Sequence, residues 1–118
     1  MKTYNKEIKA LLEAGTSATA HEGYAHKSAK NPLIVYSIVG YPSSKVITGF
    51  KTKQEVVAQL ILVADNITGI DAILSEMELM DNTSNDDFQK IYFTNGRLEP
   101  SDSGVNMRRF MVNLNLTL

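Results

Sequence analysis

The two histidines of the chain, His21 and His26, are the side chains best suited to bind a metal. They are the first and last residues of the hexapeptide HEGYAH. Two zinc ligands on one helix stand at positions i and i+4, where both side chains share a face. Here the spacing is i, i+5, which turns the second side chain by about 140° around a helix and puts it on the opposite face of a strand. Gly23 weakens a helix further. We therefore predict a polar loop at this point and no metal site.

Two pairs of carboxylates, Glu76/Glu78 and Asp86/Asp87, are the remaining candidates for acid–base chemistry. Such catalysis needs two carboxyl groups in different environments across a cleft. The glutamates lie on an expected helix surface and the aspartates in an expected loop, so both pairs are predicted to be solvated. The sequence also has no G-x-S-x-G, G-x-G-x-x-G or P-loop pattern. We therefore predict no catalytic residue, no cofactor and no enzymatic activity.

The composition is that of an ordinary globular protein, with 118 residues of which 43% are hydrophobic and 21% charged. We expect one domain over residues 1–118. The absence of cysteine excludes disulfides, thiolate nucleophiles and iron–sulfur clusters. No signal peptide is expected at the N-terminus, and the longest apolar run, residues 60–64, is far too short to cross a membrane.

The net charge of −1 argues against a specific nucleic-acid partner, but the charge is unevenly distributed along the chain. Residues 1–53 carry eight lysines and three glutamates, a net charge of +5. Residues 54–118 carry four basic and ten acidic side chains, a net charge of −6. This asymmetry is consistent with two differently solvated faces, or with a subunit whose unlike surfaces attract one another in a head-to-tail assembly.

The first half of the chain is predicted to contain a helix and two strands. Apolar residues at i, i+3 and i+4 predict a helix over residues 5–14, ended by Gly15. Residues 16–31 have no period and predict a long loop. Residues 33–41 are rich in β-branched and aromatic side chains and predict a strand, with residues 45–50 as its hairpin partner after a turn at residues 42–44.

The second half begins with an ambiguous segment, because the apolar residues of 55–64 fit a helix and one face of a strand equally well, although the β-branched start slightly favours a strand. Residues 67–80 carry one apolar stripe and predict a helix, capped by Asn66 or Thr68. An acidic loop follows at residues 81–87. Residues 88–94 predict a strand, and Asn95-Gly96 predicts a turn.

The last segment has the clearest strand alternation in the chain. One face is apolar and the other is polar; the polar face contains Arg109, Met111, Asn113, Asn115 and Thr117. This polar face is suited either to water or to a neighbouring subunit, since interfaces are enriched in Met and Arg and depleted in Lys and Glu. Together the elements predict an α+β fold, an antiparallel sheet with two helices packed on one face.

A family resemblance is carried by the order of these elements. It comprises an N-terminal helix, a Pro-apolar-Val-Tyr strand at residues 32–36, an apolar strand that runs through Ala64-Asp65-Asn66 into a helix, and a closing Gly-x-x-x-x-Arg strand at residues 104–114. In this order the chain resembles the tail terminator, or tail completion, proteins of long-tailed bacteriophages. The small-residue loop at 16–31 and the acidic loop at 81–87 depart from the family pattern.

The resemblance implies a non-enzymatic structural subunit of the virion, assembled in the host cytoplasm at the interface of head and tail. It implies a homo-oligomeric ring, usually a hexamer, whose partners are the tail tube protein and the head-side connector protein. The family has no catalytic residues to carry over. The alternative is a module of a soluble cytoplasmic protein that binds a small molecule or a peptide between sheet and helices.

The charge asymmetry predicts that the assembly is sensitive to salt. We expect Lys51 and Lys53 of one subunit to face Asp86 and Asp87 of the next, with Arg109, Met111 and Asn113 at the same interface. Raising the ionic strength toward about 1 M, where such contacts are screened, should therefore weaken assembly measured by light scattering. Assembly that is indifferent to salt over this range would contradict an electrostatic contact between subunits.

Overall fold

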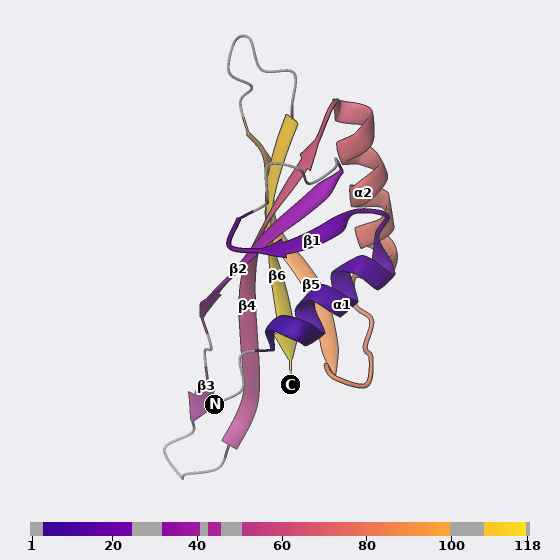
Figure 1. Cartoon of the computed structure of the whole chain (residues 1–118). Helices are drawn as coiled ribbons and strands as arrows, with labels where there is room; N and C mark the ends of the chain where they lie inside the picture. The colour runs from indigo at the N-terminus through magenta and orange to yellow at the C-terminus, as the bar shows by residue number, and fades with distance from the viewer. Residues whose placement is uncertain (1–3, 25–31, 41–42, 46–50, 100–107, 118) are drawn as a thin grey trace.

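The computed structural model describes residues 4–24, 32–40, 43–45, 51–99 and 108–117. Over these residues the chain forms two helices and six strands in an α+β arrangement (Figure 1). The order along the chain is α1 (Asn5–Gly15), β1 (Thr19–Glu22), β2 (Leu33–Gly40), β3 (Ser43–Lys45), β4 (Lys51–Ala64), α2 (Ile67–Met80), β5 (Lys90–Leu98) and β6 (Arg108–Thr117). The predicted fold class is confirmed.

The strands pair in the order β1-β2-β4-β6-β5, and β3 pairs with the beginning of β4. β4 is the longest of these strands and lies at the centre, where it pairs antiparallel with β2 on one side and with β6 on the other. The segment whose period was ambiguous in the sequence is therefore a strand. Its apolar run is dense because the even-numbered residues of 56–64 are completely buried and the odd-numbered ones are half-buried on the other face.

The segment predicted as a loop at residues 16–31 contains the short strand β1, and the prediction was wrong for that part. β1 pairs with β2 in parallel, with Thr19 opposite Leu33 and Glu22 opposite Tyr36, so the sheet is mixed. The remaining pairs are antiparallel as predicted. Only Ala20 is buried among the four residues of β1, and so short a strand gives no recognisable period in a segment rich in small side chains.

Two predicted turns also differ from the structure. The hairpin partner expected for β2 at residues 45–50 was wrong in its pairing, because β2 pairs with β4, and Ser43–Lys45 pairs with β4 as well; residues 46–50 lie outside the described part. Asn95 and Gly96 do not end a strand. They form an irregularity inside β5, where the register with β6 shifts between Thr94 and Arg97 and Asn95 takes a φ of 57°.

Both helices pack on the same face of the sheet (Figure 1). α1 contacts β1 and buries Ile8 and Leu12 completely. α2 contacts β4 and β6 and buries its stripe of Ile70, Ile73, Met77 and Met80. The side chain of Asn66 caps α2 as predicted and accepts a 2.9 Å hydrogen bond from the Gly69 backbone nitrogen.

The hydrophobic core lies between the helices and the face of the sheet that they cover. On β4 the buried positions alternate strictly, with Val56, Ala58, Leu60, Leu62 and Ala64 at 2% exposure or less. None of the helices in the described part of the chain is long and apolar enough to span a membrane.

The alternation along β4 predicts that truncating neighbouring residues lowers the free energy of unfolding by very different amounts. Leu60→Ala removes a completely buried side chain and should lower the free energy of unfolding by about 2–5 kcal/mol. Ile61→Ala, on the other face and half-buried, should cost about 1 kcal/mol or less. Chemical denaturation of the two variants measures both values, and equal costs would contradict the assignment of the core face.

The buried Tyr36 ties β2 to the start of α1. Its hydroxyl donates a 3.2 Å hydrogen bond to the backbone oxygen of Asn5. Burial raises the pKa of the Tyr36 hydroxyl above its ordinary value of 10.0, and the carboxylates of Glu22 and Glu13 raise it further. The folded chain thus holds this proton more tightly than the unfolded chain.

This proton predicts a loss of stability in alkali. The contribution of Tyr36 is complete below about pH 10 and should fall as the pH rises from there through the raised pKa. Tyr36→Phe should lower the free energy of unfolding by about 1 kcal/mol at neutral pH and give a flatter alkaline limb. Urea unfolding from pH 8 to 11 tests this, and parallel curves for variant and wild type would refute it.

Candidate functional site

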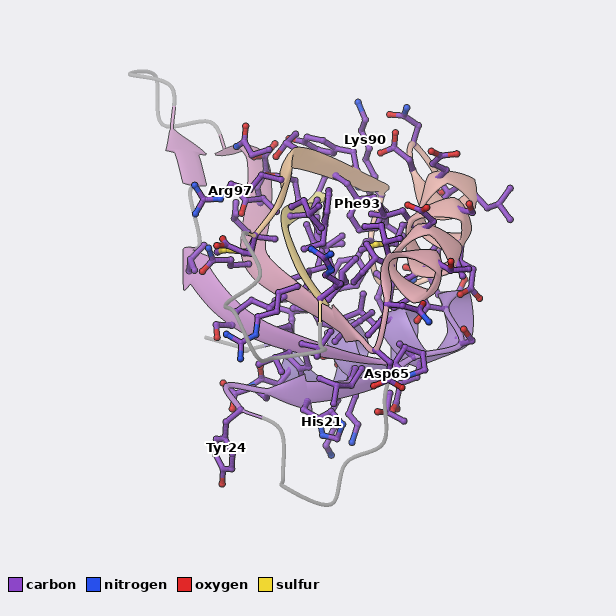
Figure 2. All side chains as sticks on the ribbon, turned by 90° about the horizontal axis from the view of Figure 1, so that it is seen from above. His21, Tyr24, Asp65, Lys90, Phe93 and Arg97 are labelled. Atoms are coloured by element: carbon purple, nitrogen blue, oxygen red, sulfur yellow. The ribbon has the colours of Figure 1, made fainter. Side chains whose placement is uncertain are left out.

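The face of the sheet turned away from α1 and α2 is the most extensive candidate interaction surface. In Figure 2 both helices lie on one side of the strands, and the described residues place no helix on the other side. We call this second side the open face. Strand register assigns to it Val35 and Ser37 of β2, Val57, Gln59, Ile61 and Val63 of β4, Arg109, Met111, Asn113, Asn115 and Thr117 of β6, and Tyr92, Thr94 and Arg97 of β5.

The centre of the open face is apolar and carries no carboxylate. Register places Val35, Ile61 and Met111 side by side in one row across three strands. The next row toward the C-terminal end of β6 contains Ser37, Gln59 and Asn113. Every one of these side chains is half-buried within the chain. The face thus combines aliphatic and uncharged polar groups, a composition that suits a contact with another protein surface.

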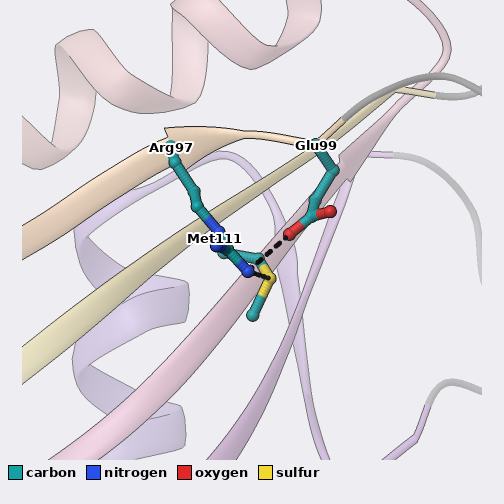
Figure 3. Close-up of polar contacts among 3 residues, drawn as sticks. All are labelled: Arg97, Glu99 and Met111. Atoms are coloured by element: carbon teal, nitrogen blue, oxygen red, sulfur yellow. Dashed lines mark hydrogen bonds and ion pairs between the residues drawn. The ribbon is translucent and has the colours of Figure 1, made fainter.

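Arg97 lies at the margin of the open face beside Met111 (Figure 3). Its Nη2 atom lies 3.7 Å from the sulfur of Met111 and 3.3 Å from Oε1 of Glu99. The Arg97 side chain is 71% exposed, so the ion pair adds little to stability. Its effect is to hold the guanidinium over the thioether, with donors left for a partner, since a guanidinium has five N–H groups.

β6 contributes the three open-face residues that the sequence singled out, Arg109, Met111 and Asn113. Arg109 is exposed and the other two are half-buried. The remaining two residues of the predicted polar face, Asn115 and Thr117, are buried inside the subunit. Asn115 donates a 2.9 Å hydrogen bond to the Thr94 hydroxyl, so its amide is used within the sheet.

The acidic loop that holds Asp86 and Asp87 is well ordered by local contacts. Oδ1 of Asn85 accepts hydrogen bonds from the backbone nitrogens of Asp87 and Phe88, at 2.9 and 2.8 Å. Phe88 is buried and its ring lies 6.0 Å from that of Tyr4. The buried ring anchors the loop, and both aspartates stay exposed beside it.

Lys51 and Lys53 belong to the first residues of β4, which extend beyond the end of β6. Glu55 is opposite Thr117, the last residue of β6, and Lys51 is opposite Lys45 of β3. The backbone nitrogen of Gln89 donates to the oxygen of the same Thr117, so the acidic loop lies at this end of the sheet too. The backbone of the two predicted segments, the start of β4 and the acidic loop, therefore lies at one end of the sheet. Whether they pair between subunits stays a prediction.

Only one of the two histidines lies within the described residues. His21 lies on β1, where its Nε2 is 3.0 Å from the Thr19 hydroxyl, and His26 lies outside the described residues. In the described part of the chain no three His, Asp or Glu side chains gather in a way that could hold a metal ion.

Sequence reasoning missed the contribution of β2, β4 and β5 to the open face. Val57, Ile61 and Val63 were read only as part of an apolar run whose period was undecided. The signal was present in the strand interpretation, since these residues are the odd-numbered positions opposite the buried Val56, Ala58, Leu60 and Leu62.

Comparisons with known proteins show a likeness of fold but no relationship in sequence. No protein-family model matches the sequence, and no curated protein is significantly similar to it. Among solved structures, a chain from the virion of a native gene transfer agent (GTA) particle has the same fold, with a TM-score of 0.53 and 12% sequence identity. The match covers 94% of this chain and 86% of the other. At this identity the comparison establishes that the two chains share a fold.

Proposed function

We propose that this chain is a non-enzymatic structural subunit of a phage-like virion, which assembles head-to-tail into a homo-oligomeric ring that ends the tail tube and joins it to the head connector. The observation that carries the proposal is the open face, an apolar sheet surface that the chain does not cover with a helix of its own among the described residues. The shared fold with a chain of a virion particle supports it, as does the order of elements in the sequence.

The composition of the open face favours a protein partner. A row of Val35, Ile61 and Met111 without carboxylates has little to offer a polar substrate, whereas half-buried aliphatic and thioether groups gain by complete burial at about 25 cal/mol per Å². Arg97 and Arg109 lie toward the margin of the same face, and an apolar centre with a polar rim is the usual anatomy of an interface.

The two faces of the subunit are unlike, which favours a ring over a symmetric dimer. A head-to-tail contact joins two different surfaces of the same chain and closes into a ring when successive rotations sum to a full turn. The chain offers the open face on one side of the sheet and a helix layer on the other (Figure 1). The net charges of +5 and −6 on its two halves also give unlike regions that can attract.

The mass of the purified chain in solution tests the proposal. Light scattering at high protein concentration should give a multiple of 13.1 kDa, close to six, and electron microscopy should reveal closed rings. Added tail tube protein should bind the ring. A monomer at every concentration that carries a small molecule through purification would contradict the proposal and favour the ligand-binding alternative.

A lysine on the open face should block assembly without unfolding the chain. Ile61→Lys places a charge in the centre of the face, and because Ile61 is only half-buried the subunit itself should tolerate it. We expect at least a tenfold rise, roughly 1.4 kcal/mol, in the concentration needed for half-maximal ring formation. The matched control is Ile61→Val, which changes the same side chain but keeps it uncharged and apolar. Equal assembly of both variants, with unchanged melting temperatures, would refute a role for the open face.

A further inference from the structure

The main sheet ends in two edge strands, β1 and β5, and each has a neighbour on one side only. The backbone N–H and C=O groups on the other side of an edge strand are a template for a strand of another molecule. Copies that pair in this way form a continuous sheet without a defined size, because the contact repeats and does not close. What occupies the outward backbone groups of β1 and β5 therefore decides whether copies can join edge to edge.

The outward side of β1 is closed by contacts within the chain. The backbone nitrogen of Gly23 donates to β2, and donors along a strand alternate between its two sides, so the nitrogen of Ala20 points outward. It donates a 3.3 Å hydrogen bond to Oε2 of Glu13 in α1. The outward oxygen of Glu22 accepts a 2.9 Å hydrogen bond from the Tyr24 nitrogen. A strand of a second copy would have to displace these contacts.

The outward side of β5 is closed by the segment that follows α2. The Ile91 nitrogen donates to the Thr83 oxygen at 2.8 Å, and the Ile91 oxygen accepts from the Asn82 nitrogen at 2.7 Å. Asn82 takes a left-handed φ of 61°, a conformation that asparagine tolerates better than most residues. The next outward nitrogen, that of Phe93, donates a 3.0 Å hydrogen bond to Oδ1 of Asp81. Beyond this point the irregularity inside β5 interrupts the edge.

Glu13 and Asp81 occupy equivalent places in the fold, since each stands at the C-terminal end of a helix and reaches an edge strand. Glu13 lies in the last turn of α1, and Asp81 is the C-cap of α2. A negative charge is unfavourable at this end of a helix because the helix dipole is negative there, and neither helix has a basic residue in its last turn. Helix stability therefore does not account for the two carboxylates, whereas the backbone donors of the edge strands do.

We propose that Glu13 and Asp81 are edge-blocking residues, whose carboxylates occupy outward donors of β1 and β5 and prevent a second copy from adding a strand at either edge. A carboxylate suits this role because it accepts hydrogen bonds and offers none to a partner strand. Its charge is also costly to bury beneath an approaching strand. The proposal does not depend on the ring, since the contacts lie within one copy. It confines contacts between copies to surfaces such as the open face.

The double variant Glu13→Ala/Asp81→Ala tests the proposal, with Glu13→Gln/Asp81→Asn as the matched control. Both pairs remove two negative charges at the same positions, but the amide oxygens of the control can still accept from the two backbone nitrogens. The particle size is followed by light scattering, and the growth of stacked strands by thioflavin T fluorescence, below the melting temperature of both variants. Should the alanine pair fail to fold, Asp81→Ala and Asp81→Asn allow the same comparison at β5 alone.

The alanine pair should grow into particles larger than those of the wild type, with rising thioflavin T fluorescence, and the amide pair should keep the wild-type size. Equal growth of the two pairs would make the lost charge the cause and overturn the proposal. The wild-type particle is the baseline whatever its size. A wild type that forms no ring therefore counts against the proposed function only, and the comparison of the two pairs still decides the role of the carboxylates.

Amide hydrogen exchange measures whether the alanine pair has uncovered the edges. In dilute protein the amides of Ala20 and Phe93 should exchange about tenfold faster than in the wild type, the loss expected for one hydrogen bond. The amide pair should exchange at the wild-type rate. The amides of β6, which is paired on both sides, are the internal reference. Unchanged exchange of Ala20 and Phe93, or faster exchange without growth of particles, overturns the proposal.

Discussion

The structure depends on the pairing of β4 along both of its edges. This pairing fixes the register of the whole sheet, and it divides the residues of a fourteen-residue strand between two faces. The chain then covers one face with α1 and α2. The core is dense because alternate residues of β4 meet those helices at almost zero exposure, and the same alternation leaves Val57, Ile61 and Val63 on the opposite side. The open face is thus a direct consequence of how the core is made.

Much of this fold could be predicted from the sequence, because the decisive patterns are local. The stripe of α2, the alternation of β6 and the Asn66 cap each depend on residues within a few positions of one another. The failures concern non-local facts. β1 is a strand only because its backbone pairs with β2 in parallel. A segment of four residues is too short for its sequence pattern to predict this pairing. Asn95-Gly96 has turn chemistry, but the ladder with β6 continues past it and uses the left-handed Asn95 as an irregularity inside the strand.

The candidate site likewise contains residues that could be predicted from local sequence patterns and residues that could not. Arg109, Met111 and Asn113 could be found from β6 alone, since its alternation is unambiguous. Asn115 and Thr117 share that alternation yet are buried, and their burial depends on neighbours in β5 and in the loop before it. The acidic loop was recognised, but the Asn85 turn and the buried Phe88 that hold it are tertiary features.

The position of β6 between β4 and β5 has a consequence for synthesis in the cell. Residues 108–117 are made after all the other described strands, yet they join β4 to β5 in the middle of the sheet. A nascent chain can form α1 and pair β2 with β4 on the ribosome, but its core stays incomplete until this strand emerges. A polypeptide interrupted before residue 108 lacks the strand that contributes Val112, Leu114 and Leu116 to the core. Unfinished translation products that lack β6 therefore cannot complete the folded sheet.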